Sequence, residues 1–161
     1  MMRQPPLSQS NHVPFRATRQ SAIAGVRFLS LKEVRDSRGT LTVCQWNEQL
    51  PFTPRRVFFC HTVPNEDVRG EHAHKECDQV LVCFNGSVEV LVDDGAQQEE
   101  HLLDASTDGL LVPAGIWASQ YRYSPHATLA VFASHDYDAD DYIRNYDEFL
   151  AYRRSICDTA A

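Results

Sequence analysis

The chain has 161 residues, of which 43% are hydrophobic, and this composition suits one globular domain with a core of its own. Its formal net charge of −7 argues against nucleic acid as the main partner. No apolar run approaches the roughly 18 residues that a membrane-spanning helix needs, and the N-terminus lacks the apolar region of a signal peptide. We therefore expect a cytoplasmic protein with no membrane partner.

Basic residues are concentrated at the start of the chain. Residues 1–32 hold five basic side chains and no acidic one, and serine, glutamine and proline recur there. A transit peptide is one interpretation of this composition. We favour a disordered or extended tail over residues 1–22, followed by one domain over residues 23–155 and a short tail over residues 156–161.

The five cysteines include no CxxC pair, and their odd number does not fit a complete set of disulfides. Cys44, Cys60 and Cys83 lie in apolar runs typical of strands, where buried free thiols are common. This pattern indicates a reducing compartment. Cys77 lies close to two histidines, but no neighbouring base or helix end is evident to activate its thiol, so we do not expect a catalytic cysteine.

Short runs typical of strands follow one another closely after the tail. The run Ser87–Val92 alternates valines with other residues, as in a half-buried antiparallel strand. Asn85-Gly86 is a strong hairpin signal, and Asp93-Asp94-Gly95 begins the next reversal. Many short strands with almost no helix predict an all-β sandwich or barrel. The expected strands are Val26–Leu31, Thr40–Trp46, Arg55–His61, Gln79–Phe84, Ser87–Val92, His101–Leu103, Leu110–Val112, Trp117–Tyr123 and Leu129–Ala133.

The end of the chain has helical periodicity instead. We expect one amphipathic helix from about Asp138 to Arg153. Acidic residues crowd its first turn and arginines its last, and both distributions favour the helix dipole. Its apolar face, which would pack on the β-sheet body, consists of Tyr142, Tyr146, Phe149 and Leu150.

The segment Arg69–Lys75 contains two histidines, His72 and His74, with one residue between them. Side chains alternate along a β-strand with period two, so both imidazoles would point to the same face. Two histidines beside an arginine make either part of a metal site or a pair of proton carriers.

The rest of the sequence argues against the metal site. A metal-binding cupin would have a glutamate about four or five positions after the second histidine, where this chain has Asp78 or Gln79. It would also have a histidine at the end of a P-x-G-x-x-H motif, where Ala118 stands here. The set of metal ligands is incomplete, and we expect neither a metal nor another cofactor.

Seven segments carry a resemblance to a known family: Asp36–Leu41, Arg56–Phe59, Arg69–Lys75, Gln79–Ser87, Asp93–Gly95, Pro113–Trp117 and Asp140–Phe149. In this order and spacing they resemble the sugar 3,4-ketoisomerases, cupin enzymes of the WxcM-like group that act on dTDP-4-keto-6-deoxy-glucose. The resemblance covers about residues 26–150. It implies a cupin-type jelly roll with one C-terminal helix, and a homodimer with or without exchanged N-terminal strands. It also implies metal-free chemistry on a nucleotide-linked deoxysugar.

Two positions depart from the pattern of this family. The family commonly has two tyrosines where this chain has Phe58 and Phe59, and the first tyrosine is thought to assist the proton transfer. It also often has a histidine where Ala118 stands. Both changes remove a polar group from the expected pocket, so they bear on the reaction rather than on the fold.

Moving a carbonyl group from C-4 to C-3 of a hexose requires a base that removes the C-3 proton and returns a proton to C-4. We expect His72 to be that base, because histidine titrates near neutrality. His74 would orient the substrate or donate to the enediolate oxygen. Phe58 cannot donate a proton, so another donor is needed. The candidate donors are His61, Thr62 and Tyr121. The alternative for both histidines is a structural role in the barrel, with no part in a reaction.

The other candidates would bind the substrate. Arg69 precedes Gly70 and offers fork geometry to a pyrophosphate, and a surface charge is the alternative. Arg38, in the turn after Asp36, has the same two interpretations. Trp117 follows the Pro-x-Gly turn, which favours the mouth of the pocket over the core. The expected substrate-binding residues are Arg38, Phe58, Arg69, Gln79, Trp117 and Tyr121.

Three functions are compatible with these patterns. The first is an isomerase that moves the keto group of a nucleotide-linked 4-keto-6-deoxy hexose from C-4 to C-3. The second is a non-catalytic cupin that binds a nucleotide sugar or a partner enzyme, which the changes at Phe58 and Ala118 would fit. The third is a metal-dependent small-molecule cupin. Metal analysis separates the third from the others, and turnover of the nucleotide sugar separates the first two.

Overall fold

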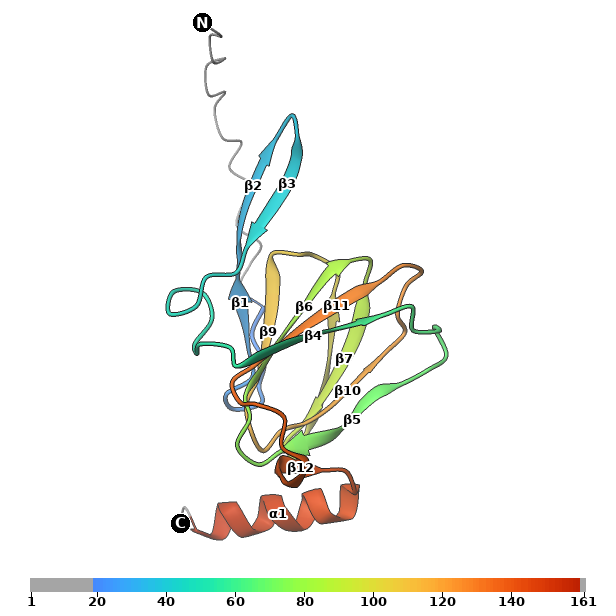
Figure 1. Ribbon diagram of the computed structural model, residues 1–161. Coiled ribbons are helices and arrows are strands. Elements are labelled where there is room, and N and C mark those ends of the chain that lie inside the picture. Colours follow the sequence, from blue (N-terminus) through green and yellow to red (C-terminus); the bar gives the residue numbers. More distant parts are fainter. Residues whose placement is uncertain (1–18, 160–161) are drawn as a thin grey trace, which may run out of the picture.

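The computed structural model describes residues 19–159, and most of the predicted N-terminal tail lies outside them. Two five-stranded sheets face each other (Figure 1). The first has the order β1 (Arg27–Ser30), β9 (Asp108–Val112), β6 (Gln79–Asn85), β11 (Thr128–Ala133) and β4 (Arg56–His61). The second has the order β12 (Tyr142–Ile143), β5 (Arg69–His74), β10 (Trp117–Tyr121), β7 (Val88–Asp93) and β8 (Gln98–Leu103).

Every strand pair in these sheets is antiparallel, and consecutive strands often lie in opposite sheets. Two antiparallel sheets that exchange strands in this way form a jelly roll. Outside the sheets, the described residues contain one α-helix, α1 (Tyr146–Thr159), and one short 3₁₀ helix, η1 (Ala139–Asp141). The prediction of an all-β, cupin-type jelly roll with one C-terminal helix is confirmed.

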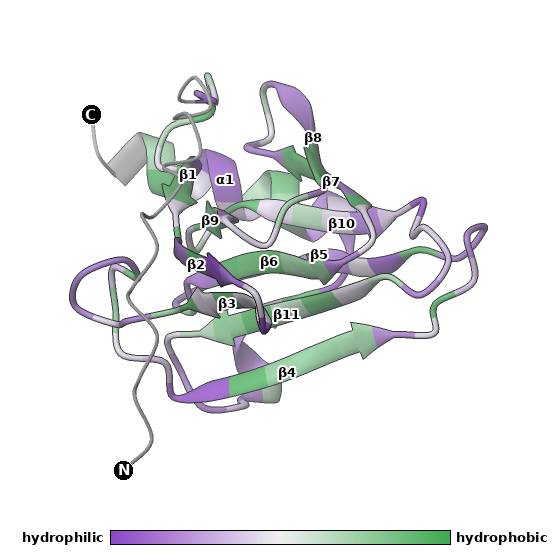
Figure 2. Ribbon diagram, turned by 90° about the horizontal axis from the view of Figure 1, so that it is seen from above, coloured by the Kyte–Doolittle hydropathy of each residue, from purple (hydrophilic) through white to green (hydrophobic). Residues whose placement is uncertain are grey.

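The main core lies between the two sheets. Val88, Val90 and Val92 on β7 are fully buried, whereas Glu89 and Leu91 between them are only half buried. Because side chains alternate along a strand, this pattern directs one face of β7 into the core. The green strands β6 and β11 of Figure 2 belong to the opposite sheet and supply apolar side chains from the other side.

One predicted hairpin is not a hairpin. Asn85-Gly86 connects β6 to β7, which lie in different sheets and do not pair. Gly86 has a φ of +70°, and a Cβ atom there would lie 2.4 Å from the Ser124 Oγ atom. Glycine is therefore required by a tight corner that carries the chain across the core, rather than by a two-residue hairpin turn. The reversal at Asp93-Asp94-Gly95 does join paired strands, β7 and β8.

A two-stranded hairpin of β2 (Lys32–Asp36) and β3 (Gly39–Val43) projects away from the sheets (Figure 1). The sequence analysis missed β2, because four of its five residues are charged and no apolar alternation marks a strand. Val34 and Leu41 face each other across the two strands and are 43% and 61% exposed. The hairpin thus presents an apolar pair outside the core of its own chain.

Residues just before the predicted domain boundary at residue 23 contact the jelly roll. Ser21 Oγ and the Ala22 backbone N–H both donate to the Glu99 carboxylate on β8. Gln20 also forms an isolated bridge with Arg27. These contacts tie residues 20–22, which the sequence analysis placed in the tail, to the jelly roll.

The C-terminal helix begins later and ends later than predicted. Tyr146 is its first residue, whereas the prediction ran from Asp138 to Arg153. Residues 138–143 form η1 and then β12, because Tyr142 and Ile143 pair with the free edge of β5. Asn145 caps the helix through its side-chain oxygen, which accepts from the Glu148 N–H. The predicted tail over residues 156–161 overlaps the last turn of α1.

The helix covers the outer face of the second sheet at one end. Phe149 is fully buried against Trp117 on β10, and Ala73 and Ile143 complete this small cluster. Tyr142 points elsewhere, so the predicted apolar face is correct for Tyr146 and Phe149 and wrong for Tyr142. The described part of the chain has no helix with the length and apolarity needed to span a bilayer.

Candidate active site

The two histidines of the HxH motif point into the space between the sheets from strand β5. His72 pairs with Ala118, whose side chain belongs to the inter-sheet core. The register shifts just before this pair, where Gly70 and Glu71 have φ values of +83° and +54°. A Cβ atom on Gly70 would lie 2.8 Å from the Ala118 carbonyl oxygen, so glycine is needed for this bulge.

Hydrogen bonds fix which nitrogen of each histidine carries a proton. His72 Nδ1 lies 2.9 Å from the Gly70 carbonyl oxygen, which can only accept, so this nitrogen is the donor. His74 Nδ1 lies 2.7 Å from Asp141 Oδ2 and donates to that carboxylate. In the neutral state both Nε2 atoms are therefore free of protons.

The two Nε2 atoms face each other at 3.2 Å. The side-chain amide nitrogen of Gln79 lies 3.1 Å from His74 Nε2 and donates to it. The lone pair on His74 is thereby occupied, while the lone pair on His72 Nε2 faces another lone pair rather than a donor. His72 is the member of the pair that is ready to accept a proton.

Asp141, the last residue of η1, fixes the side chain of His74 on β5. Its Oδ1 atom accepts from the backbone N–H groups of Lys75 and Glu76, at 3.0 and 2.7 Å. Both hydrogen bonds, together with the bond from His74, lower the pKa of Asp141, although its burial acts in the opposite direction. The carboxylate therefore stays ionised and fixes the orientation of His74.

Burial keeps both histidines neutral near pH 7. The pKa of His74 falls to about 4, because desolvation outweighs the stabilising Asp141 carboxylate. Burial also lowers the pKa of His72, and the positive charges of Arg144 and Arg56 act in the same direction. A histidine with a lowered pKa is a competent base at neutral pH.

Aromatic and cationic side chains surround the histidine pair. The ring centroid of Tyr142 lies 4.9 Å from that of His72 and 4.3 Å from that of His74. Arg56 Nη2 donates to the Tyr142 hydroxyl at 3.4 Å, and its guanidinium lies 5.6 Å from the Phe58 ring centroid. The Nε atom of Arg56 is buried without a hydrogen-bond partner among residues 19–159.

Arg144 adds a second cation beside the histidines. Its guanidinium carbon lies 4.0 Å from the centroid of the Tyr142 ring, a distance typical of a cation–π contact. Tyr137 lies against Arg56 in a similar way, at 5.5 Å. An acidic protein thus has a locally positive site.

Three predicted site residues accompany the histidines. Gln79 contacts His74 directly. Phe58 lies on β4, with its Cα atom opposite that of the inward-facing Val131. Arg69 starts β5, and its Cα partner is Gln120, whose amide lies against Gly70. Arg69 is exposed at the end of the strand that carries the pair.

Three other predicted site residues do not meet the histidines within this chain. Trp117 points to the opposite face of the sheet and packs against Tyr146 and Phe149. Tyr121 donates its hydroxyl to Glu100 on β8. Arg38 lies at the tip of the projecting hairpin, where it pairs with Asp36 and is 87% exposed.

The other two candidate donors are also elsewhere. His61 and Thr62 contact each other at the end of β4, with 3.0 Å between Nδ1 and Oγ1. They line a separate cleft of about 890 Å³, formed with the loop before β11. The tyrosine whose ring contacts both histidines is instead Tyr142, which the sequence analysis had assigned to the helix.

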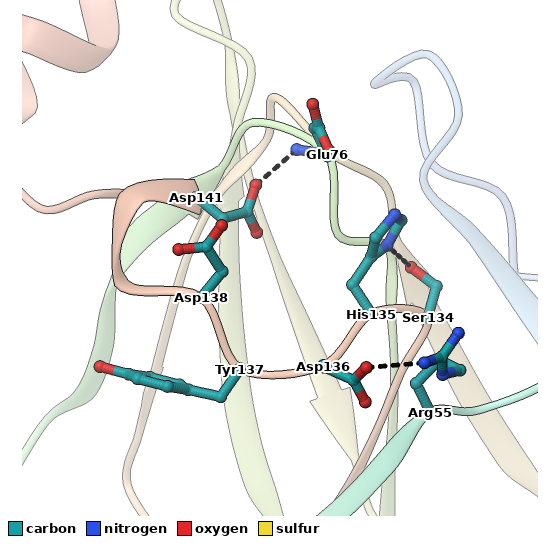
Figure 3. A pocket seen from close by; sticks show the side chains of 8 residues that line it. All are labelled: Arg55, Glu76, Ser134, His135, Asp136, Tyr137, Asp138 and Asp141. Carbon is teal, nitrogen blue, oxygen red and sulfur yellow. Dashed lines mark hydrogen bonds and ion pairs between the residues drawn. The ribbon is translucent and has the colours of Figure 1, made fainter.

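A second, outer cavity of about 290 Å³ lies behind Asp141 (Figure 3). Figure 3 shows Asp141 and Asp138 side by side, with Glu76 above them. Arg55 and Asp136 form an ion pair at its rim, with 2.7 Å between Nη2 and Oδ2. Its lining residues are Arg55, Glu76, Ser134, His135, Asp136, Tyr137, Asp138 and Asp141.

Three side chains lie close enough together to be considered as ligands of a metal ion. Atoms of His74, Cys77 and Asp141 lie within 4.8 Å of one another. His74 and Asp141 are, however, joined by a 2.7 Å hydrogen bond, and the Cys77 thiol donates to the Asp78 carbonyl oxygen at 3.4 Å. The arrangement is that of a hydrogen-bonded pair beside a thiol, and it does not match open metal ligands.

The sequence analysis missed four residues of the site, Arg56, Asp141, Tyr142 and Arg144. Three of them lie in the segment that was assigned to the start of the helix. The fourth, Arg56, is the first residue of a segment quoted for the family resemblance. Both segments had been quoted for the family resemblance. That Asp141, Tyr142 and Arg144 belong to the site is visible only once β12 is seen to pair with β5.

Comparison with known proteins agrees with this geometry. Residues 24–154 match the family described as FdtA: WxcM-like, C-terminal. A curated relative, the TDP-4-oxo-6-deoxy-alpha-D-glucose-3,4-oxoisomerase of Aneurinibacillus thermoaerophilus, is 40% identical over 130 residues, which cover 81% of this chain and 94% of that protein.

Two solved structures are similar over most of the chain. QdtA, a sugar 3,4-ketoisomerase from Thermoanaerobacterium thermosaccharolyticum in complex with TDP, has a TM-score of 0.81 and 31% identity, covering 83% of this chain and 97% of its own. WlaRB, a TDP-quinovose 3,4-ketoisomerase from Campylobacter jejuni, has a TM-score of 0.76 and 38% identity, covering 80% of this chain and 99% of its own. This chain therefore belongs to the WxcM-like family of sugar 3,4-ketoisomerases.

Proposed function

We propose that this protein moves the keto group of a nucleotide-linked 4-keto-6-deoxy hexose from C-4 to C-3, with His72 as the base. The observation that carries the proposal is the proton arrangement of the histidine pair. Both Nδ1 atoms donate, Gln79 occupies the His74 lone pair, and the lone pair of His72 Nε2 is left free of a donor. The relatives that share most of this chain are named as isomerases of this type.

In the first step His72 Nε2 takes the proton from C-3. The electron pair of the broken C–H bond forms the C-3–C-4 double bond, and negative charge collects on the C-4 oxygen. In the second step His72 returns a proton to C-4, and the proton of the C-3 hydroxyl moves to the C-4 oxygen, so that the C-3 oxygen becomes the carbonyl oxygen and C-4 carries a hydroxyl. One base that reaches both carbons is sufficient for this sequence.

The charge that develops on the sugar oxygens needs positive or donor groups nearby. The buried Nε atom of Arg56 has no hydrogen-bond partner in the described part of the chain and carries part of a positive charge. Such a preorganised cation in a dry site stabilises an enediolate strongly. We assign this role to Arg56, with Arg144 as the second cation.

Tyr142 is the donor that we assign in place of a tyrosine at position 58. Its hydroxyl accepts a hydrogen bond from Arg56, which makes the phenol a better donor to an oxyanion. Phe58 lies against the same guanidinium but has no proton to give. The reaction can therefore keep a phenolic donor although Phe58 lacks one.

The substrate class follows from the relatives and from the charges of the site. TDP is bound in QdtA, and the curated relative is named for a TDP-4-oxo-6-deoxy sugar. A nucleotide sugar carries a diphosphate, for which arginine is the preferred partner. Arg69 is exposed at the start of β5, on the strand that carries both histidines, and we assign it to the diphosphate.

We assign two further properties that the function makes reasonable. The first is a homodimer in which the β2–β3 hairpin of one copy packs on the other. Val34 and Leu41 on the hairpin are exposed, and so are Val57 and Phe59 on the outer face of β4. The second is location in the cytoplasm, where nucleotide sugars and reduced cysteines occur together. Light scattering on the purified protein tests the dimer, and a monomer at micromolar concentration would contradict it.

The direct test of the function is incubation with dTDP-4-keto-6-deoxy-glucose followed by proton NMR of the sugar. We expect the C-3 proton signal to disappear and a new C-4 proton signal to appear as the 3-keto sugar forms. A protein that binds the nucleotide sugar but leaves its spectrum unchanged would instead be the non-catalytic cupin suggested by Phe58 and Ala118.

A further inference from the structure

The buried histidine pair is connected to the outer cavity by one side chain, Asp141. His74 is 5% exposed and Asp141 is 12% exposed, and Asp141 lines the cavity of about 290 Å³ behind the strand. The carboxylate therefore has the imidazole of His74 on one side and solvent space on the other. Figure 3 shows Asp141 among the side chains that line this cavity.

We propose that Asp141 is the inner end of a proton path that joins the histidine pair to the outer cavity, so that protons taken from the substrate exchange with solvent through Asp141. The proposal rests on the proposed function, because it concerns the proton that His72 removes from the sugar. It assigns to Asp141 a role that goes beyond orienting His74.

The path consists of three transfers along hydrogen bonds. After His72 Nε2 has taken the sugar proton, it lies 3.2 Å from His74 Nε2, and as a cation it is a stronger donor than the neutral Gln79 amide, which it displaces from that lone pair. The proton can then pass to His74. His74 then gives its Nδ1 proton to Asp141 Oδ2 across 2.7 Å. Asp141 finally releases that proton to solvent in the outer cavity. No bond other than N–H and O–H bonds forms or breaks in these transfers, and the reverse sequence returns a solvent proton.

Two hydrogen bonds make Asp141 suitable as a short-lived carrier of a proton. The backbone N–H groups of Lys75 and Glu76 hold its carboxylate in place, so the group does not rotate away when it is protonated. They also favour the ionised form, so a proton on Asp141 is released quickly. Acidic side chains of the lining, Glu76 and Asp138, attract protons into the same cavity.

Asp141→Asn should block the proton path by changing which nitrogen of His74 carries the proton. In the wild-type protein both carboxylate oxygens accept hydrogen bonds, whereas asparagine has one oxygen and one NH₂ group. If the oxygen keeps the backbone N–H groups, the NH₂ group faces His74 Nδ1, which must then accept. The proton of His74 moves to Nε2, and this nitrogen can no longer receive a proton from His72.

The experiment is turnover of unlabelled dTDP-4-keto-6-deoxy-glucose in D₂O by the full-length protein, with NMR of the product. We expect the wild-type product to carry solvent deuterium at C-4 in a large share of molecules. We expect Asp141→Asn to turn over more slowly and to lose most of that deuterium, because the sugar's own proton is returned. Asp147→Asn, the same change at an exposed position on the first turn of α1, should match the wild type.

Equal deuterium at C-4 in the wild type and Asp141→Asn would overturn the path, and so would a wild-type product without deuterium. Absence of any product from the wild type would instead refute the proposed function. The role of Asp141 is then still decided by a second measurement that needs no turnover, the ¹⁵N NMR tautomer of His74. We expect the proton on Nδ1 in the wild type and on Nε2 in Asp141→Asn, and an unchanged tautomer would contradict the proposal.

Discussion

His74 and Asp141 are 67 residues apart in the sequence, and their side chains meet at 2.7 Å through Nδ1 and Oδ2. This contact sets the protonation of the whole site. It places the proton of His74 on Nδ1, leaves Nε2 as an acceptor for Gln79, and leaves the lone pair of His72 Nε2 without a donor. It exists because β12 pairs with the edge of β5, which brings Asp141 beside the HxH motif.

The pH dependence of the reaction should reflect the lowered pKa of His72. The base works when it is unprotonated, so kcat/KM should fall only as the pH falls through that pKa, below the ordinary value of 6.5. A pH–rate profile measures this acid limb. Arg144→Gln removes one of the charges that lower the pKa, so it should move the limb to higher pH. An acid limb at or above pH 6.5 in the wild type would contradict the assignment.

Tyr142→Phe should lower kcat by about 10²-fold with little change in KM, because the ring is retained and only the phenolic donor is lost. Steady-state kinetics on the nucleotide sugar measures the effect. Tyr152→Phe is the matched control, because the Tyr152 hydroxyl lies on α1 and donates to the Lys75 carbonyl oxygen at 3.4 Å. A Tyr142→Phe variant with wild-type kcat would show that Tyr142 is not the donor.

Phe58→Tyr should have little effect alone but should restore part of the activity of Tyr142→Phe. The Arg56 guanidinium lies over the Phe58 ring and donates to the Tyr142 hydroxyl, so a phenol at either position can donate to the same oxyanion. A double-mutant cycle on kcat measures this coupling. If Phe58→Tyr by itself raised kcat by about 10²-fold or more, the wild type would lack an effective donor and our assignment of Tyr142 would be wrong.

The purified protein should retain full activity after treatment with a chelator and should contain no stoichiometric zinc, iron or nickel. The expected chemistry uses proton transfer and cationic side chains, and the ligand set of a metal-binding cupin is incomplete at Gln79 and Ala118. Elemental analysis and activity after chelation test this. Loss of activity on chelation, with recovery on addition of one metal, would favour a metal-dependent cupin.

The sequence was sufficient for an all-β sandwich or barrel and for the direction of both histidines, because these depend on local patterns: valine alternation in β7, short strands between turns, and the period of two across His72 and His74. The family, and with it the cupin-type jelly roll, came from the resemblance of seven ordered segments to known enzymes. The position of Gln79 in the pocket could also be predicted, because this residue begins a strand whose inward face is apolar.

The sequence was not sufficient for the segment that completes the site. Residues 138–153 have a continuous helical pattern, but pairing with the open edge of β5 outweighs helix propensity at Tyr142 and Ile143. Trp117 was misplaced for a similar reason, because the bulge at Gly70 and the position of α1 decide which face of β10 is inner. Such long-range pairings leave no local signal.

The most direct measurement of the central claim is the turnover of His72→Asn on dTDP-4-keto-6-deoxy-glucose, followed by NMR. We expect kcat to fall by about 10²- to 10⁴-fold, with an unchanged melting temperature and unchanged TDP affinity. His126→Asn is the matched control, because His126 lies in an exposed loop with a φ of +63° that asparagine also tolerates. A folded His72→Asn variant with the wild-type rate would contradict the assignment of His72 as the base.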